Sequence, residues 1–492
     1  MLSQLPILQV VLPLMAAPIS LILRNARLVW FFALISSGLT FAISLVLMQQ
    51  VYQGGEIVYT IGGWQAPVGI EYRLDALNTF LLVLVSAIGF IALLAARTSI
   101  EKEISDDKQT YFYIAYLLCL AGLLGILATG DAFNVFVFLE ISSLASYTLI
   151  ALGNDRRALW ASYQYLIMGT IGATFILIGI GLMYMMTGTL NMADMAERLP
   201  EVTQTKTIFT AFAFFIVGVC LKLALFPLHL WLPNAYTYAP SIVTAFLAAT
   251  ATKVAIYILV RFVFTIYGVD FSLNHLPLQN ILLVLGLLGV FMASIVAIYQ
   301  TNVKRLFAYS SVAQIGYMML GFSLGSKTGL MATLLHLFNH ALMKGALFLA
   351  LAGVMFRFNS TNLHRFNGLG KQLPLTMAAI VVGGLSLIGV PLTVGFVSKW
   401  YLVLAMLEQG YWPVAALILL GSLLAVVYVW RLVEAAYFKP VDSDNIHVKE
   451  APLSILVPTW ILVIANIYFG IDTRFTIAVT EMATNTLFGA TP

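Results

Sequence analysis

The sequence is poor in charged residues. Only 9% of its 492 residues are Asp, Glu, Lys or Arg, while 61% are hydrophobic and the mean hydropathy is +0.96. A soluble protein carries about 25% charged residues, because charge is what covers a water-facing surface. The sequence therefore excludes a water-soluble globular protein. It predicts an all-α integral membrane protein whose backbone polar groups are paired inside helices.

Cysteine and cofactor motifs are also scarce. The two cysteines, Cys119 and Cys220, both lie in apolar runs, and no CxxC pair is present. Local spacing thus excludes an iron–sulfur or zinc site, and both residues are expected to be small core side chains. The sequence contains neither a Walker A loop nor a GxGxxG turn, which are needed to bind ATP or a dinucleotide. We expect no metal and no cofactor, so any enzymatic role would depend on partner chains. A net charge of +4 gives no nucleic-acid footprint.

What the sequence has instead is long apolar runs, many of about 20 residues, the length that crosses about 30 Å of hydrocarbon. The first run is followed by Arg24 and Arg27 rather than preceded by basic residues, so we expect a retained helix and not a signal peptide. Between the second and third runs, alternating residues around Gly62-Gly63 predict a small surface hairpin. The runs predict 14 transmembrane helices, at residues 5–23, 28–50, 75–96, 110–128, 130–152, 160–187, 207–228, 241–265, 279–299, 304–323, 328–356, 373–406, 412–437 and 453–470.

The basic residues of the loops are unevenly divided between the two sides of the membrane. Most of them lie in the loops that follow the odd-numbered runs. By the positive-inside rule these loops face the cytoplasm. Both termini are then expected on the non-cytoplasmic side of the cell membrane.

Two runs are too long for one straight helix, and each contains a proline. Pro227 lies in the seventh run and Pro391 in the twelfth, and proline breaks a helix because it lacks the N–H donor. Each run carries a lysine within about two turns of its proline, Lys222 before the first and Lys399 after the second. This pattern predicts two inverted five-helix repeats with a discontinuous helix in each. The repeats would be runs 4–8 (110–265) and runs 9–13 (279–437) of a single membrane domain (1–492).

Four lysines lie inside the apolar runs: Lys222, Lys253, Lys344 and Lys399. A charge at the bilayer centre costs about 2.5–3.5 kcal/mol, so four lysines facing lipid would cost on the order of 10 kcal/mol, and they are expected to face the bundle interior. Desolvation favours the neutral amine and a nearby carboxylate favours the charged one, so a lysine between both can exchange a proton. Glu140 is the only carboxylate near the centre of a run and is the expected partner of Lys222. The alternative is a static ion pair that fixes helix register.

A further run carries His336, His340 and Lys344 at positions i, i+4 and i+8, which places them on one helix face. We expect such a row to pass protons through intervening water. The alternative is that the histidines only hydrogen-bond neighbouring groups. His229, just after Pro227, is either a pathway residue or a cap for the carbonyls of the broken helix.

Three other basic residues at run ends are expected to be structural. Lys304 and Arg305 open the tenth run and are expected to anchor the chain at the cytoplasmic surface. Arg261 lies near the end of the eighth run and is expected to extend to water.

The segment Leu221–Tyr236, with its Lys222, Pro227 and Leu228-His229-Leu230-Trp231-Leu232-Pro233 stretch, resembles the signature of the antiporter-like subunits. This family comprises the Mrp multisubunit cation/proton antiporters, the proton-pumping membrane subunits of respiratory complex I and the membrane-bound hydrogenases. Three further segments agree: Phe138-Leu139-Glu140, Gln300–Ser311 and His336–Lys344. With the 14 runs, the resemblance covers nearly the whole chain.

The resemblance implies a polar axis of Glu140, Lys222, Lys253, His336, His340, Lys344 and Lys399. It also implies partners, namely other hydrophobic subunits of a hetero-oligomeric membrane complex.

The chain length and the lysine at 399 resemble the D-type subunits of Mrp antiporters, which predicts the proton-translocating subunit of an Na⁺(K⁺)/H⁺ antiporter. Complex I subunits often have an acidic residue where this chain has Asn234, and a second proline where it has Ser241. The alternatives are a proton-pumping subunit of a complex I-like NADH–quinone oxidoreductase or hydrogenase, a scaffold that does not transport, and a self-sufficient single-chain carrier.

Overall fold

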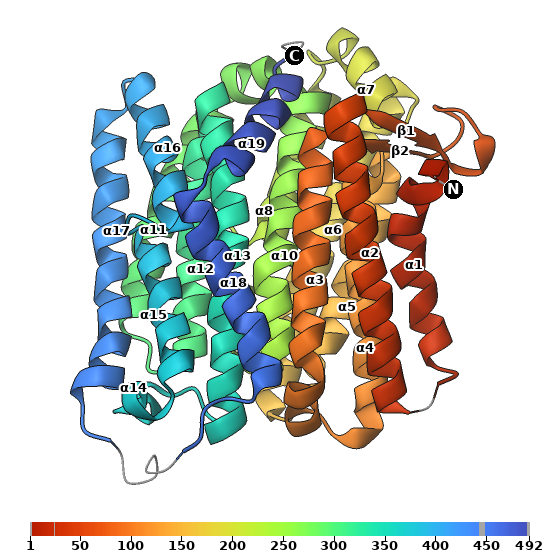
Figure 1. Ribbon diagram of the computed structural model, residues 1–492. Coiled ribbons are helices and arrows are strands. Elements are labelled where there is room, and N and C mark those ends of the chain that lie inside the picture. Colours follow the sequence, from red (N-terminus) through yellow and green to blue (C-terminus); the bar gives the residue numbers. More distant parts are fainter. Residues whose placement is uncertain (1, 24, 442–447, 490–492) are drawn as a thin grey trace.

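A computed structural model describes residues 2–23, 25–441 and 448–489, so Arg24 lies outside the described residues. The chain is a bundle of helices that run up and down side by side (Figure 1). The first part holds α1 (Leu5–Ser20), α2 (Ala26–Gly54), α3 (Ala76–Glu103), α4 (Asp106–Ala128), α5 (Ala132–Ala151), α6 (Arg156–Thr187), α7 (Met192–Arg198), α8 (Lys206–Leu223), α9 (Trp231–Tyr238) and α10 (Ser241–Val260). The second part holds α11 (Leu278–Ile298), α12 (Val303–Ser323), α13 (Lys327–Phe358), α14 (Leu369–Gln372), α15 (Pro374–Ile388), α16 (Val394–Glu408), α17 (Trp412–Val433), α18 (Leu453–Ile471) and α19 (Arg474–Leu487).

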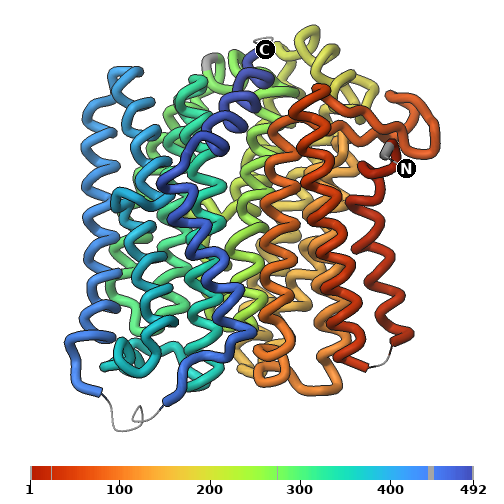
Figure 2. The backbone as a smooth tube through the Cα atoms, in the orientation of Figure 1, coloured from red at the N-terminus to blue at the C-terminus, as the bar shows by residue number. Residues whose placement is uncertain are grey.

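The helices have the length and composition of membrane spans. Among the described residues, 11 helices are long and apolar enough to cross a membrane, and α1 and α15 are shorter apolar helices. The prediction of an all-α membrane protein is thereby confirmed. The first described residues and the end of α19 lie at the same end of the bundle (Figure 2).

Eight of the 19 described α-helices begin at a polar residue whose side chain accepts a hydrogen bond from the first turn, which satisfies a free N–H of the helix N-terminus. Asp75 forms a full capping box with Asn78 at the start of α3. At the starts of α5, α6 and α12, the side chains of Asp131, Asp155 and Asn302 each accept one backbone N–H, without the reciprocal bond of a capping box. These caps set where each span ends and the connecting loop begins.

The predicted surface hairpin is present. Strands β1 (Ile57–Thr60) and β2 (Glu71–Leu74) pair antiparallel, with Ile57 opposite Leu74. The hairpin is tied to the bundle because Glu71 is buried and accepts a hydrogen bond from Asn191 (2.9 Å), the cap of α7.

Both predicted breaks occur, and they end their first helix in the same way. Ala224 (φ 60°) ends α8 and Gly389 (φ 94°) ends α15, each in the left-handed region. In both, the next N–H reaches back five residues, from Leu225 to the Cys220 carbonyl (3.0 Å) and from Val390 to the Leu385 carbonyl (3.1 Å). This is the usual bonding of a left-handed helix C-cap.

Two short backbone bridges have matching places in the two parts of the chain. Asp131, before α5, pairs with Asn191, after α6, and Asn302, before α12, pairs with Asn362, after α13. In each bridge two backbone hydrogen bonds of 2.7–2.9 Å connect the flanking residues. The first bridge lies beside α7 and the second near α14, at opposite ends of the bundle (Figure 1).

Candidate proton pathway

Glu140 and Lys222 meet as the sequence predicted. The Lys222 ammonium, in the last turn of α8, lies 3.7 Å from a Glu140 carboxylate oxygen on α5 and donates to the Ser143 hydroxyl at 2.8 Å. A small cavity of about 30 Å³ is lined by Lys222 and Ser143, enough for about two waters. Beside this pair, α6 and α8 approach each other closely because they meet at glycines. A Cβ on Gly218 would lie 2.6 Å from the Gly172 carbonyl oxygen.

Glu140 is less enclosed than its partner. Its side chain is 26% exposed on the flank of the isolated chain, whereas that of Lys222 is 6% exposed. The more buried carboxylates, Glu71, Asp75 and Glu103, lie near helix or strand ends. Among the described residues of the apolar runs, Glu140 thus remains the carboxylate near the centre of a run, but it faces both Lys222 and the outside of this chain.

Lys253 lies fully buried in the middle of α10, the helix that packs between α3 and α13. Its ammonium donates to the Ala248 carbonyl and to the Thr252 hydroxyl. Within the described part of the chain it forms no ion pair. A buried ammonium with only neutral acceptors is stabilised far less than one beside a carboxylate.

The three groups on α13 lie on one face but in different surroundings. His336 is held at both nitrogens, by Ser398 Oγ (2.8 Å) and Gln314 Oε1 (2.9 Å). His340 is buried, and neither of its ring nitrogens has a hydrogen-bond partner among the described residues. The two rings are parallel, with centroids 6.3 Å apart. Lys344, one turn further on, donates to the Phe307 carbonyl (2.8 Å) and the Ser310 hydroxyl of α12.

Lys399 reaches back across the second break. From the first half of α16 its ammonium donates to the carbonyls of Leu387 and Ile388, at the end of α15, and to Ser422 Oγ on α17, each at 2.9 Å. The ring of Tyr317 lies 4.8 Å from the ammonium. The lysine therefore caps the negative end of the α15 dipole.

His229 does not cap the end of α8. The Leu221 carbonyl accepts instead from the indole of Trp231 (3.0 Å). His229 is largely buried, stacks on Phe226 with centroids 5.2 Å apart, and its Nδ1 has no hydrogen-bond partner among the described residues. His229 also has a backbone hydrogen-bond contact at Pro227, so both predicted roles, pathway residue and cap for carbonyls of the broken segment, stay predictions.

The structure corrects two predictions about basic residues at run ends. Lys304 is not a surface anchor: it is only 2% exposed, and its ammonium donates to the Ala239 carbonyl at 3.0 Å. Arg261 does not extend to water either, because its guanidinium pairs with Asp75 at 2.7 Å and both side chains are about nine-tenths buried. In each case a neighbouring segment covers a position that the sequence places near the membrane surface.

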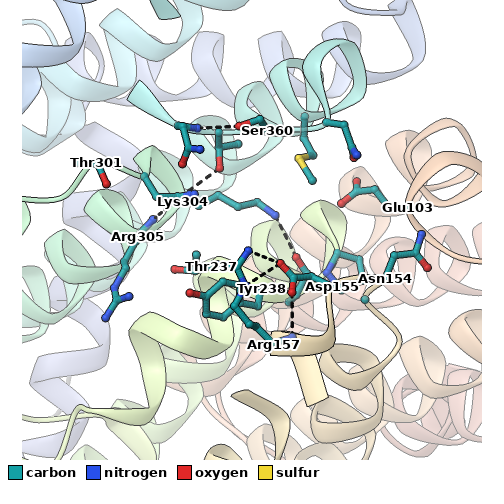
Figure 3. A pocket seen from close by; sticks show the side chains of 18 of the residues that line it. Glu103, Asn154, Asp155, Arg157, Thr237, Tyr238, Thr301, Lys304, Arg305 and Ser360 are labelled. Atoms are coloured by element: carbon teal, nitrogen blue, oxygen red, sulfur yellow. Dashed lines mark hydrogen bonds and ion pairs between the residues drawn. The ribbon is translucent and has the colours of Figure 1, made fainter. Parts of the chain in front are cut away.

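Lys304 lines a polar cavity of about 650 Å³ at the end of the bundle that carries the basic loops. Figure 3 shows its side chain pointing towards the side of the cavity where Glu103 and Asp155 lie. Glu103, the last residue of α3, accepts from the Ser241 N–H (2.8 Å) and hydroxyl (3.0 Å). At the cavity wall, hydrogen bonds from Arg157 lower the pKa of Asp155.

Sequence reasoning missed Glu103 and misread Lys304. A signal was available for Lys304, which lies inside the Gln300–Ser311 segment that carries the family resemblance. Glu103 gave none, because it stands in a charged stretch at the end of an apolar run and resembles any exposed loop residue.

No group of three or more His, Cys, Asp or Glu side chains able to hold a metal is found in the part of the chain that the structure describes. The bundle with its buried amines and imidazoles defines a multi-pass membrane protein with titratable groups in its interior.

Comparison with known proteins gives the family. Residues 129–425 match the family model described as NADH:quinone oxidoreductase/Mrp antiporter, TM. NADH-quinone oxidoreductase subunit N of Desulforudis audaxviator is 41% identical over 96% of both chains, and the D-type subunit of the Na(+)/H(+) antiporter of Alkalihalophilus pseudofirmus is 33% identical over 80% of this chain and 79% of that one. A chain of the membrane-bound sulfane sulfur reductase, an archaeal respiratory membrane complex, superposes with a TM-score of 0.90 at 31% identity, covering 98% of both. The chain belongs to the NADH:quinone oxidoreductase/Mrp antiporter family.

Proposed function

We propose that this chain is the proton-translocating membrane subunit of a multisubunit Na⁺(K⁺)/H⁺ antiporter. Protons would move along Glu140, Lys222, Lys253, His336, His340, Lys344 and Lys399, with His229 as a further pathway residue. The observation that carries the proposal is the burial of four lysines inside the predicted spans, Lys222, Lys253, Lys344 and Lys399. Among the described residues, only the first of these forms an ion pair with a carboxylate.

The physical argument concerns the cost of the charged state. Lys253, Lys344 and Lys399 donate to carbonyls and hydroxyls, which satisfy the N–H groups but do not neutralise the charge. The charged form of such a lysine is held by dipoles alone, and the amine can take up and release a proton. Water or side-chain motion would bridge neighbouring groups, and the unpartnered nitrogens of His340 are suited to bind such water.

We further propose that the membrane domain (1–492) has 14 spans and two inverted repeats, 110–265 and 279–437. The matching breaks and the two bridges support the repeats. The paired residues are Asp131 with Asn191 and Asn302 with Asn362, and both pairs are 60 positions apart in the chain, by subtraction of their numbers. The bridges lie at opposite ends of the bundle, as inversion requires (Figure 1).

The polar cavity beside Lys304 is the proposed proton entrance. Its rim contains basic loop residues, which by the positive-inside rule face the cytoplasm, so both termini would lie on the non-cytoplasmic side of the cell membrane. Lys304 and Ser310, a hydrogen-bond partner of Lys344, are six residues apart on α12. The rise between them is about 9 Å, a gap that a few waters can span.

Partner subunits decide between two complexes. The second candidate is a proton-pumping subunit of a complex I-like NADH–quinone oxidoreductase or membrane-bound hydrogenase, and the 41% identity to a quinone oxidoreductase subunit favours it. Purification of the chain in mild detergent, followed by mass spectrometry of bound proteins, separates the two. Small hydrophobic subunits alone would support the antiporter, whereas iron–sulfur, flavin or nickel-bearing subunits would overturn it in favour of the redox pump.

Replacement of Lys222 tests the proton pathway in either complex. In proteoliposomes, the complex with Lys222→Ala should assemble normally but lose proton movement measured with a pH-sensitive dye. Lys327→Ala is the matched control, because Lys327 is half exposed at the start of α13. Unchanged transport in Lys222→Ala would make the chain a scaffold and sink the proposal.

A further inference from the structure

The ammonium of Lys399 occupies a site with the ligands of a monovalent cation. Three oxygens surround it at 2.9 Å: the Leu387 and Ile388 carbonyls and the Ser422 hydroxyl. Two come from the open end of α15 and one from α17, so the set is assembled from separate helices. The ring of Tyr317 from α12 presents a π-face to the same centre at 4.8 Å, a further cation-stabilising contact.

The chemistry of the ligands restricts which cation can bind. All three oxygens are neutral, and divalent cations in proteins are bound with the help of carboxylates. Carbonyls at the C-terminal end of a half-helix suit Na⁺ or K⁺, because they place a partial negative charge on the cation without a full counter-charge. None of the ion pairs in the described parts of the chain includes Lys399, so the ammonium is held there by neutral oxygens.

We propose that these oxygens bind Na⁺ or K⁺ in exchange for the Lys399 ammonium. The cation enters when the amine loses its proton and withdraws, and a returning proton on the amine expels the cation. The proposal rests on the proposed function and gives the exchanged cation a place next to the proton path. His336 contacts Ser398, the neighbour of Lys399, so the proton row on α13 ends beside the site.

The first break offers no such exchange. There the end of α8 is capped by the indole N–H of Trp231, a donor that keeps its proton. Exposure does not separate the two breaks, because Leu230 after the first is 68% exposed and Leu392 after the second is 66% exposed. The difference lies in the cap: a proton on the Lys399 amine can be exchanged, whereas the indole at the first break keeps its own.

Radioactive ²²Na⁺ and ⁸⁶Rb⁺ binding to the purified complex tests the site. The groups that face Lys399 are Ser422, Tyr317 and, through Ser398, His336. In the unmodified complex, cation binding should rise between pH 6 and pH 9, because the protonated amine competes with the cation for the same three oxygens. In Lys399→Ala, binding at pH 6 should be at least about tenfold tighter, because the competing ammonium is gone.

Ser422→Ala keeps the test valid even if Lys399→Ala fails to assemble. This variant leaves the lysine in place and should weaken binding at pH 9, while Ser422→Thr should restore it. Cation binding that changes neither with pH nor in Ser422→Ala would refute the proposed site. Transport without binding here would refute the cation site alone, whereas binding without transport would refute the antiporter and leave the site standing.

Discussion

At the first break the lysine precedes the proline and turns away from it, whereas at the second it follows the proline and reaches back. Lys222 meets Ser143 and Glu140 on α5, and a neutral indole caps the helix end. Lys399 itself caps the helix end and meets no carboxylate in the described part of the chain. The same backbone interruption thus serves an ion pair in one half and an amine held by peptide carbonyls in the other. The lesson is that the charge partner, and not the break, sets how an amine at this depth behaves.

The largest effect is expected where the second break is most tightly packed. A Cβ on Gly395 would lie 1.8 Å from the Ser386 carbonyl oxygen, so Gly395→Ala must push α15 and α16 apart. We expect a loss of about 3 kcal/mol, the upper range for overpacking, and little assembled complex by size-exclusion chromatography. Gly181→Ala on α6 is the control, because nothing lies within 4 Å of a Cβ there. Normal assembly of Gly395→Ala would show that the break is more pliable than this contact implies.

Removal of the Glu140 carboxylate should slow proton transport without changing cation binding at the second break. Glu140→Gln leaves Lys222 with neutral partners only, the Ser143 hydroxyl and the new amide, and the loss of the negative charge slows reprotonation of the amine. We expect at least about tenfold slower proton transport in proteoliposomes, since breaking a largely buried pair is costly. Cation binding at the second break should be unchanged. If Glu140→Gln weakened ²²Na⁺ or ⁸⁶Rb⁺ binding to the same degree, the two breaks would not be independent sites.

The polar cavity lies between the first and second halves of the chain, and a substitution there should slow proton entry. Lys304, from the second half, holds the Ala239 carbonyl at the end of α9 in the first half. Lys304→Met keeps most of the side-chain volume but removes the amine, so proton transport should fall about tenfold while assembly persists. The control is Arg305→Met, because Arg305 lines the same cavity but is only half-buried. Equal losses in both variants would point to a general charge effect at the rim.

The sequence predicted the parts of this comparison that depend on local pattern. Pro227 and Pro391 marked the breaks because proline interrupts the helix in which it stands. The Glu140–Lys222 pair was predicted because a buried amine has the lowest free-energy cost beside a carboxylate. Lys304, Glu103 and Arg261 could not be placed this way. Their burial depends on which segments cover the ends of the spans, and that is decided by tertiary packing. Whether a charge at a run end meets water or protein is therefore not encoded in the run itself.

The terminal helix α19 was missed for a related reason. It spans Arg474–Leu487 after the last apolar run, and its threonines Thr476, Thr480 and Thr484 are buried against the bundle. A face made of threonine gives little hydropathy contrast. Only its packing on α3 and α13 identifies the covered side.

The smallest expected effect tests whether the cap of the first break is only structural. Trp231→Phe removes the indole N–H from the Leu221 carbonyl while an aromatic ring can still stack on Tyr165, whose centroid lies 3.9 Å from that of Trp231. The Leu221 carbonyl still accepts the Ala224 N–H at 3.3 Å, so the variant loses one hydrogen bond, about 0.5–1.5 kcal/mol. The melting temperature should fall slightly while proton transport stays close to normal. Lys399→Met removes the equivalent cap of the second break and should abolish transport as well as lower stability. If Trp231→Phe also abolished transport, the cap at the first break would belong to the proton path. The two caps would then differ in the chemistry of the donor, indole or amine, and have the same role in transport.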